Sequence, residues 1–230
     1  MKKKIAISFS GGKDSILALN RIIASNEWDV CCLVTTITED NERTTMHGVR
    51  EALLDEQASA LNIPLQKVYI PKNCSNDTYE KIMSRMIQEL IMDDVTHMMF
   101  GDIRLEDIRK YRETMLKDTT IQPVFPIWGE DTRRLINEFL NEGYQTIVTC
   151  TDGQQLDSAF TGRVINRSFL NDLPSHVDPC GENGEFHTFV FDGPLFKHKI
   201  RFRPDETLTV QKDLFSGRDR FYYADLVPCI

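Results

Sequence analysis

The stretch Ser10-Gly11-Gly12-Lys13-Asp14-Ser15 decides the fold of this 230-residue chain. The apolar run 5–9 before it indicates a short buried strand, and residues 16–24 carry apolar side chains at helical spacing. A strand, a glycine-rich turn and a helix N-terminus together present backbone N–H groups to an anion. The glycines let a phosphate approach the backbone, the serines can bond its oxygens, and the aspartate can hold a bridging Mg²⁺. The stretch therefore predicts a phosphate-binding loop.

Two better-known phosphate loops do not match this stretch. No G-x-x-x-x-G-K-[ST] string surrounds Lys13, and G-x-G-x-x-G is also absent there. An ordinary strand-to-helix turn with a serine cap is the structural alternative. The complete six-residue string at the first strand–helix junction favours phosphate binding over that alternative.

Strand-like and helical patterns alternate through the first two thirds of the chain. We expect strands at 29–37, 65–70, 97–103, 123–128 and 145–150, and helices at 48–61, 79–91, 105–117 and 131–141. Strands separated by helices of 10–15 residues are typical of βαβ units. The sequence thus predicts an α/β fold with a largely parallel sheet and helices on both faces.

The pattern changes after Asp152. A polar helical stretch at 156–170 is followed by a region rich in Pro and Gly and by short strand-like runs. We therefore predict an α/β nucleotide-binding domain at 1–152 and a smaller α+β module at 153–230.

Composition restricts the class of protein. No apolar run approaches the ~20 residues of a membrane span, and the apolar stretch after Met1 is too short for a secretory signal. The net charge of −8 argues against nucleic-acid binding, which usually needs a basic surface. We expect a cytoplasmic protein without membrane contact and leave a homodimer open.

The six cysteines contain no C-x-x-C pattern, so free thiols in a reducing compartment are expected. Cys31 and Cys32 are adjacent in a predicted strand. Neighbouring side chains on a strand point to opposite faces, so we expect these two thiols to point apart.

A second informative string runs from Asp178 to Thr188. It places Glu182, Asn183, Glu185 and His187 around two glycines. In a strand, Glu185 and His187 would share one face, with the phenylalanine between them facing the core. A glycine-rich turn before an edge strand, with its polar side in water, is the structural alternative.

Together these strings resemble a known family. The loop 10–15 is similar to the S-G-G-x-D-S signature of the PP-loop ATP pyrophosphatases. With Gly101-Asp102, the string 181–188 and the run 192–196, the chain from Lys4 to Phe196 resembles the short form of the diphthine–ammonia ligase family. The resemblance implies a Rossmann-like, HUP-type sheet and an ATP-dependent amide ligase.

The resemblance also implies a reaction and its participants. ATP adenylates a carboxylate, pyrophosphate leaves, and ammonia attacks the acyl-adenylate to give an amide and AMP. The carboxylate would be diphthine on the translocating elongation factor, or a different small molecule.

Site residues follow from the same resemblance and from the residue chemistry. The residues that would bind ATP are Ser10, Gly11, Gly12, Lys13, Asp14 and Ser15, and Asp14 would also hold Mg²⁺. Catalysis would depend on Glu182, Glu185 and His187. The substrate would contact His47, Gly101, Asp102, Asn183 and Thr188. The alternative, purely structural roles are a helix cap for His47 and a turn for Asp102. Arg104, Arg109 and Arg112 are most simply a solvated helix face, although Arg104 or Arg109 could meet an anionic substrate.

Two other functions compete with the amide ligase. A tRNA thiolase or lysidine-type synthetase would also use a PP-loop, but the acidic charge and the missing C-x-x-C argue against it. A non-catalytic module that binds adenine nucleotides gives no reason for so many reactive groups in the string 182–188.

Overall fold

A parallel sheet forms one half of the molecule. The computed structural model describes residues 2–44, 47–205, 207–213 and 216–229. The strands of this sheet are β1 (Lys3–Ser8), β2 (Trp28–Thr38), β3 (Arg43–Thr44), β4 (Leu65–Ile70), β5 (His97–Met99) and β6 (Gln122–Val124). Their order is β3-β2-β1-β5-β6, and β4 also pairs with β2. All these pairings are parallel except β2 with β3, which confirms the α/β prediction.

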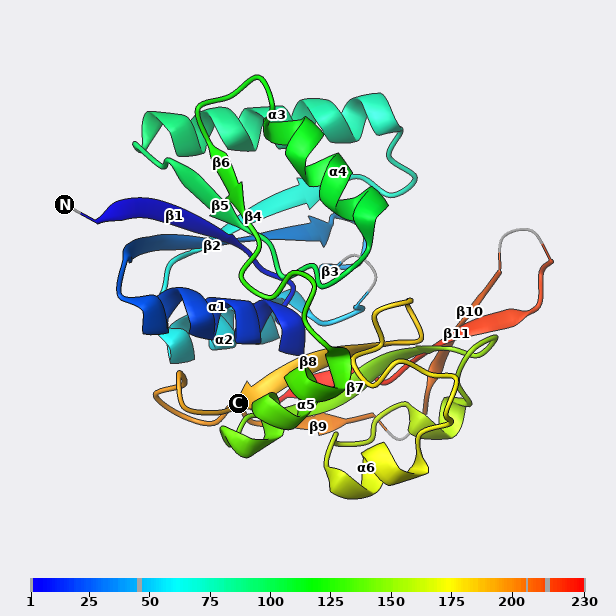
Figure 1. Cartoon of the computed structure of the whole chain (residues 1–230). Coiled ribbons are helices and arrows are strands. Elements are labelled where there is room, and N and C mark those ends of the chain that lie inside the picture. Colours follow the sequence, from blue (N-terminus) through cyan, green and yellow to red (C-terminus); the bar gives the residue numbers. More distant parts are fainter. Residues whose placement is uncertain (1, 45–46, 206, 214–215, 230) are drawn as a thin grey trace.

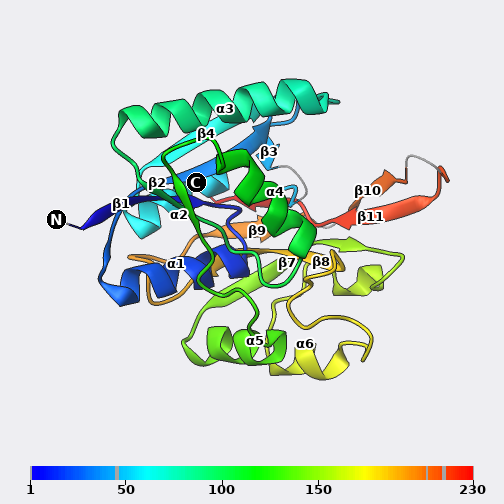
Figure 2. The same cartoon turned by 45° about the horizontal axis from the view of Figure 1, so that its top comes forward.

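Helices cover both faces of this sheet. Helices α1 (Lys13–Ser25) and α2 (Glu51–Leu61) lie on one side, and α3 (Asn76–Met92) and α4 (Glu106–Leu116) lie on the other (Figures 1 and 2). Apolar side chains of α3 pack with β5 in one buried cluster. Side chains of α1 and α2 belong to a second cluster that continues into the C-terminal half. The α1–α2 layer therefore joins the two halves.

An antiparallel sheet organises the C-terminal half. Its strands are β7 (Gln145–Asp152), β8 (Phe186–Asp192), β10 (Thr209–Lys212) and β11 (Asp219–Tyr223), in the order β10-β11-β7-β8. A second pair joins β9 (Phe202–Pro204) to β12 (Leu226–Pro228), and α5 (Thr132–Asn141) and α6 (Arg167–Asp172) lie beside the larger sheet (Figure 1). The β10–β11 hairpin projects from the body in both ribbon views (Figures 1 and 2).

Two sequence expectations differ from this half of the structure. Strand β7 does not extend the parallel sheet but pairs antiparallel with β8 and β11, because an apolar run indicates a buried strand without naming its partner. The expected helix at 156–170 is instead a short turn at Ser158–Phe160 followed by α6. Between them Gly162 takes a φ of +80°, which a helix does not allow. The domain boundary after Asp152 stays a prediction.

The phosphate-loop stretch lies directly against β8. The Val190 amide donates to the Gly11 carbonyl oxygen over 2.9 Å, and the Lys13 amide donates to Thr188 Oγ1 over 3.1 Å. Gly11 has a φ of +76°, and a Cβ there would lie 2.4 Å from Gln57 Oε1. Only glycine therefore fits this position without backbone strain and without displacing the side chains of Gln57 and Leu54.

An arginine-bound carboxylate ties the C-terminal segment to the first sheet. Asp225 accepts hydrogen bonds from Arg43 at 2.8 and 2.9 Å and from Arg50 at 2.9 and 2.6 Å. Hydrogen bonds from Arg50 and then Arg43 hold the pKa of Asp225 well below its usual range. Asp225 is therefore charged at neutral pH and links β12 to the β2–β3 hairpin.

We expect Asp225→Asn to lower the free energy of unfolding by about 1–3 kcal/mol at pH 7, because two arginines lose a charged acceptor. Because the pKa of Asp225 is lower in the folded state, its charge stabilises the fold at pH values above its unfolded pKa of about 4. This stabilisation is lost as the pH falls from there towards the folded pKa. The difference between parent and variant should therefore shrink below about pH 4. Urea denaturation across pH measures it, and Asp219→Asn on the exposed hairpin is the control. An equal loss from both variants would contradict the assignment.

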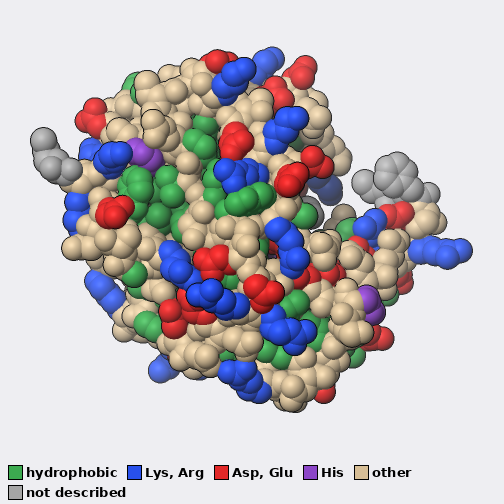
Figure 3. Space-filling model, viewed as in Figure 1, with side chains coloured by type: hydrophobic (Ala, Val, Ile, Leu, Met, Phe, Trp, Pro, Cys, Tyr) green, Lys and Arg blue, Asp and Glu red, His purple; other side chains and the backbone are tan. Residues whose placement is uncertain are grey.

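The surface and the helices bear on two other expectations. In the face shown in Figure 3, acidic and basic side chains are interspersed, with no single basic patch. Within the part of the chain that the structure describes, no helix is both long and apolar enough to cross a membrane.

Candidate functional site

A cavity of about 670 Å³ lies between the two halves of the molecule. The ends of β1, β2 and β5 and the start of α1 form one side, and the loop before β8 forms the other. Ligand pockets usually span about 300–1,000 Å³, so a nucleotide and a second reactant fit this size class. Eleven predicted site residues line it: Ser10, Lys13, Asp14, Ser15, His47, Gly101, Asp102, Glu182, Asn183, His187 and Thr188.

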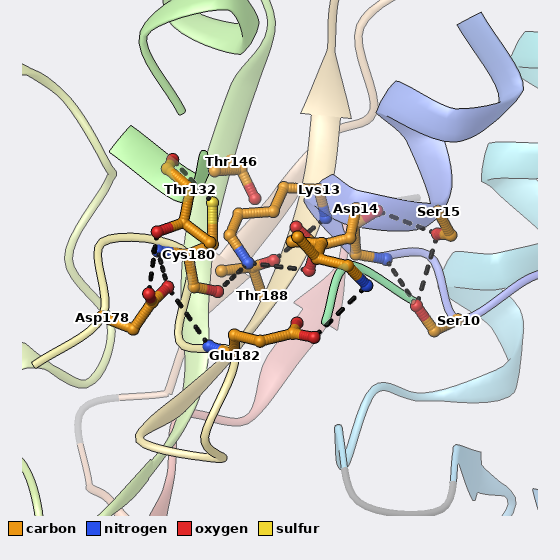
Figure 4. Close-up of polar contacts among 12 residues, drawn as sticks. Ser10, Lys13, Asp14, Ser15, Thr132, Thr146, Asp178, Cys180, Glu182 and Thr188 are labelled. Carbon is orange, nitrogen blue, oxygen red and sulfur yellow. Dashed lines mark hydrogen bonds and ion pairs between the residues drawn. The ribbon is translucent and has the colours of Figure 1, made fainter. Parts of the chain in front are cut away.

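Hydrogen bonds within the loop set its shape (Figure 4). Ser10 Oγ accepts from the Gly12 amide over 3.3 Å, and Ser15 Oγ donates to the Gly12 carbonyl over 2.9 Å. The two serine hydroxyls lie 3.3 Å apart. Gly11 and Gly12 are not among the residues that line the cavity, and they contribute to the loop through its backbone. Both hydroxyls line the cavity at the N-terminus of α1, a position that suits an anion such as a phosphate group.

Lys13 is buried and closely bound. Its Nζ lies 2.8 Å from Asp14 Oδ2 and also donates to the Cys180 carbonyl oxygen. Burial is the largest single influence on the pKa of Lys13 and lowers it, but the combined attraction of Asp14, Cys180 and Glu182 makes the net shift upward. Burial raises the pKa of Asp14. The loop thus holds the Lys13 ammonium in a fixed position, and its ion-pair partner, the Asp14 carboxylate, also lines the cavity.

The Gly101-Asp102 pair stands at the carboxyl end of β5, beside the loop. A Cβ on Gly101 would lie 3.1 Å from the Asp14 backbone, so glycine permits this close approach. Asp102 Oδ2 lies 3.8 Å from Arg112 Nε, and neither buried atom has a hydrogen bond. Burial raises the pKa of Asp102. Asp102 and Arg112 therefore both line the cavity, and each retains an atom that has no hydrogen-bond partner.

Glu182 and Glu185 have different environments. Glu182 lines the cavity, and its Oε1 accepts from the amides of Ile103 at 3.2 Å and Arg104 at 2.9 Å. Burial raises the pKa of Glu182. The Glu185 side chain is buried outside the cavity lining, where it accepts from the Asp178 amide and from both nitrogens of Asn183, each over 2.9 Å.

Glu185 therefore shapes the loop that carries Glu182. Glu185 comes directly before β8, and its carbonyl oxygen still accepts from the Asp152 amide of β7. His187 lines the cavity and Glu185 does not, so a common face for these two side chains stays a prediction.

Two neutral imidazoles stand together on the cavity wall. The rings of His47 and His187 are 4.6 Å apart, and His47 Nδ1 lies 3.3 Å from the Thr188 carbonyl oxygen. Burial lowers the pKa of His47 to about 4 and that of His187 well below its usual range. Both rings are therefore uncharged at neutral pH. His47 is not a helix cap, because Arg50 occupies that position before α2.

Sequence reasoning missed part of the wall. Arg112 reaches the cavity from α4, whereas Arg104 bonds Asp178 and Arg109 stacks on Phe125 and Trp128. The helix pattern gave no reason to select Arg112 from this basic series.

A second group missed by the sequence comes from the antiparallel sheet. Asp152, Gln155, Arg220 and Phe221 line the far end of the cavity, and Arg220 Nη2 lies 2.9 Å from Asp152 Oδ2. Burial raises the pKa of Asp152, but the hydrogen bonds from Arg220, the Gln154 amide and Gln155, with the charge of Arg220, together lower the net value. Asp152 follows a predicted strand, which is a signal that could have selected it. Arg220 lies in a hairpin without any motif.

Metal ligands are sparse. Among the described residues, no group of three or more His, Cys, Asp or Glu side chains is arranged to hold a metal ion. A Mg²⁺ ion at Asp14 would therefore take most of its oxygen ligands from phosphates and water, as is usual for this ion at nucleotide sites.

Comparisons with known proteins agree with this geometry. Residues 3–123 match the profile of the diphthamide synthase N-terminal domain, and residues 131–216 match that of the C-terminal domain. Diphthine–ammonia ligases of Bos taurus and Homo sapiens are each 25% identical to the chain, over 93% of it and 88% of each relative. The enzyme of Schizosaccharomyces pombe is 22% identical over 86% of the chain but only 36% of its own length. The N-terminal profile alone spans more than half of the residues, and the chain therefore belongs to the diphthamide synthase family.

Proposed function

We propose that this protein is an ATP-dependent ligase that adenylates a carboxylate, releases pyrophosphate and transfers ammonia to the acyl-adenylate. One observation carries the proposal. The phosphate-type loop at Ser10–Ser15 and the reactive string at Glu182–Thr188 line the same cavity, and the Lys13 amide bonds Thr188 directly. A module that only binds nucleotides does not need the second string.

The loop side supports the first half-reaction. AMP is a much better leaving group than oxide, so activation requires attack of the carboxylate on the α-phosphate. The hydroxyls of Ser10 and Ser15 and the Lys13 ammonium line the cavity and provide positive character where pyrophosphate charge develops. Mg²⁺, when bound near Asp14, would neutralise further phosphate charge. Arg112, close to Asp102, offers a further cation to an anionic reactant.

The loop before β8 supports the second half-reaction. Ammonia attacks as NH₃ and must lose a proton as the amide forms. Glu182 is held by two backbone amides through Oε1, and a raised pKa makes its carboxylate a better proton acceptor. The neutral rings of His47 and His187 can accept hydrogen bonds from NH₃, whereas protonated rings would donate to its lone pair and block its attack. Glu182 is thus our choice for the base, and Glu185 for its positioning residue.

Our candidates for the acceptor carboxylate are chosen from the names of the relatives and not from the shape of the cavity. The curated relatives are named for diphthine, so protein-bound diphthine is the first candidate and a smaller carboxylate the second. The six cysteines are free, which supports a cytoplasmic location for the reaction.

The products of ATP cleavage test the proposal. We expect AMP and pyrophosphate as the products, with sustained turnover only when both ammonia and an acceptor carboxylate are present, measured against blanks that lack one of them. Mg-ATP alone should raise the thermal midpoint by mass action. Chromatography of the nucleotides with a pyrophosphate assay gives the answer. ADP and orthophosphate as the only products from a clean preparation would overturn the assignment.

A further inference from the structure

The thiols of Cys31 and Cys32 lie on the same side of β2. Strand β1 pairs Ile5 with Val30 and Ala6 with Cys32, which leaves Cys31 without a partner on the neighbouring strand. Such a bulge adds one residue to a strand and interrupts the alternation of its side chains. Both cysteines pack against the cluster beneath α3, and their Sγ atoms are 3.8 Å apart. The expectation that they point to opposite faces is therefore wrong.

The surroundings of the pair favour reaction at sulfur. Both residues are only partly buried. Cys31 Sγ lies 3.2 Å from the Ile5 carbonyl oxygen. Hydrogen bonding from Cys32 lowers the pKa of Cys31 to about 7, and the same interaction raises that of Cys32. The thiolate is the form that binds metals and electrophiles, so the pair has one thiol ready to react at neutral pH.

Geometry favours a bridging atom over a disulfide. The Cα atoms of adjacent residues are about 3.8 Å apart, which is less than the roughly 4.4–6.8 Å usual for a disulfide. In contrast, two sulfurs bound to one tetrahedral centre through bonds of about 2.3 Å are about 3.8 Å apart. The observed Sγ separation of 3.8 Å matches that of two thiolates on one tetrahedral metal, and the shorter span at pyramidal arsenic(III) requires only a small approach of the two sulfurs.

We propose that Cys31 and Cys32 form a two-thiol binding site for a soft, thiophilic metal or metalloid centre, with trivalent arsenic as its test case. Thiolates prefer such soft centres over hard cations. With an organoarsenic(III) oxide, two S–H bonds break and two As–S bonds form. The oxide oxygen leaves with both protons as water, and arsenic stays trivalent. Neither cysteine lines the nucleotide cavity, so this site is separate from it.

Phenylarsine oxide is the probe, because it binds tightly only where two thiols reach one arsenic. On the reduced, folded protein we expect one arsenical per molecule and the loss of two reactive thiols, those of Cys31 and Cys32. Peptide mass spectrometry should place the adduct on the peptide that contains Cys31 and Cys32. This mapping uses the parent protein and needs no variant to fold.

Single variants then test the two-thiol requirement. Cys31→Ser and Cys32→Ser should each weaken arsenical binding by about 10²-fold or more, because the second bond is no longer intramolecular. Cys74→Ser and Cys229→Ser, which alter cysteines elsewhere, should bind as the parent does. An adduct that maps to other cysteines, or that both pair variants retain at parental affinity, would overturn the proposal.

Discussion

Glu182→Gln should reduce amide formation by about 10²-fold or more and leave Mg-ATP binding close to that of the parent. Glutamine keeps the length of the side chain and can still accept from the amides of Ile103 and Arg104 through its carbonyl oxygen. It cannot take a proton from attacking ammonia. The loss should therefore appear in kcat rather than in nucleotide affinity.

Glu185→Gln is the matched comparison. This variant makes the same replacement of a carboxylate oxygen by an amide nitrogen, but in the side chain of Glu185, which accepts three hydrogen bonds outside the cavity. An amide nitrogen there faces N–H donors, so this variant should lose thermal stability as well as turnover. Calorimetry and rate measurement on both variants separate the roles. Parental turnover in Glu182→Gln, or a loss of ATP binding in it, would exclude Glu182 as the base.

Gly12→Val should weaken ATP binding by about 10²-fold, equivalent to about 3 kcal/mol. A Cβ at Gly12 would already lie 3.1 Å from the Thr188 carbonyl oxygen and 3.2 Å from His47 Cε1. The two γ-methyl groups of valine have no room on that side and must push the loop away from β8. The phosphate would then meet displaced N–H groups.

A graded series makes this test specific. Gly12→Ala needs only a few tenths of an ångström of adjustment and should bind ATP with an intermediate affinity. Gly143→Ala, where φ is +90° with nothing within 4 Å of the new Cβ, strains the backbone far from the cavity. It should lower the thermal midpoint yet keep the full stabilisation by Mg-ATP. Equal ATP affinity in the parent and Gly12→Val would refute a phosphate role for the loop.

The sequence was informative wherever local chemistry determines structure. The loop at Ser10–Ser15 needs glycines at fixed positions and lies at a strand–helix junction, so residue types alone located it. The helices α1 to α5 follow from apolar spacing, and the structure adds side-chain caps such as Ser75 before α3 and Asp131 before α5. Strand ends at Gly101-Asp102 share an edge with the loop because parallel strands do so in all such sheets.

What the sequence could not supply depends on contacts between distant segments. The partner of β7 lies about 35 residues further along the chain in β8, and no local pattern specifies that pairing. Arg112 and Arg220 resemble the other surface arginines until the fold turns them towards the cavity. The bulge at Cys31 arises from the register between two strands, which side-chain alternation cannot reveal.

The contact between the loop and β8 also sets an order of events during synthesis. The partners of the Lys13 amide and the Gly11 carbonyl, Thr188 and Val190, lie more than 170 residues further along the chain. Chains grow at about 5–20 residues per second, so the loop leaves the ribosome many seconds before its partner strand exists. A nascent parallel sheet can assemble in that interval, but its loop amide and carbonyl must bond water until β8 arrives. If the loop binds ATP as we propose, competence to hold ATP is acquired late in translation, although the proposed contact residues are among the first to be made.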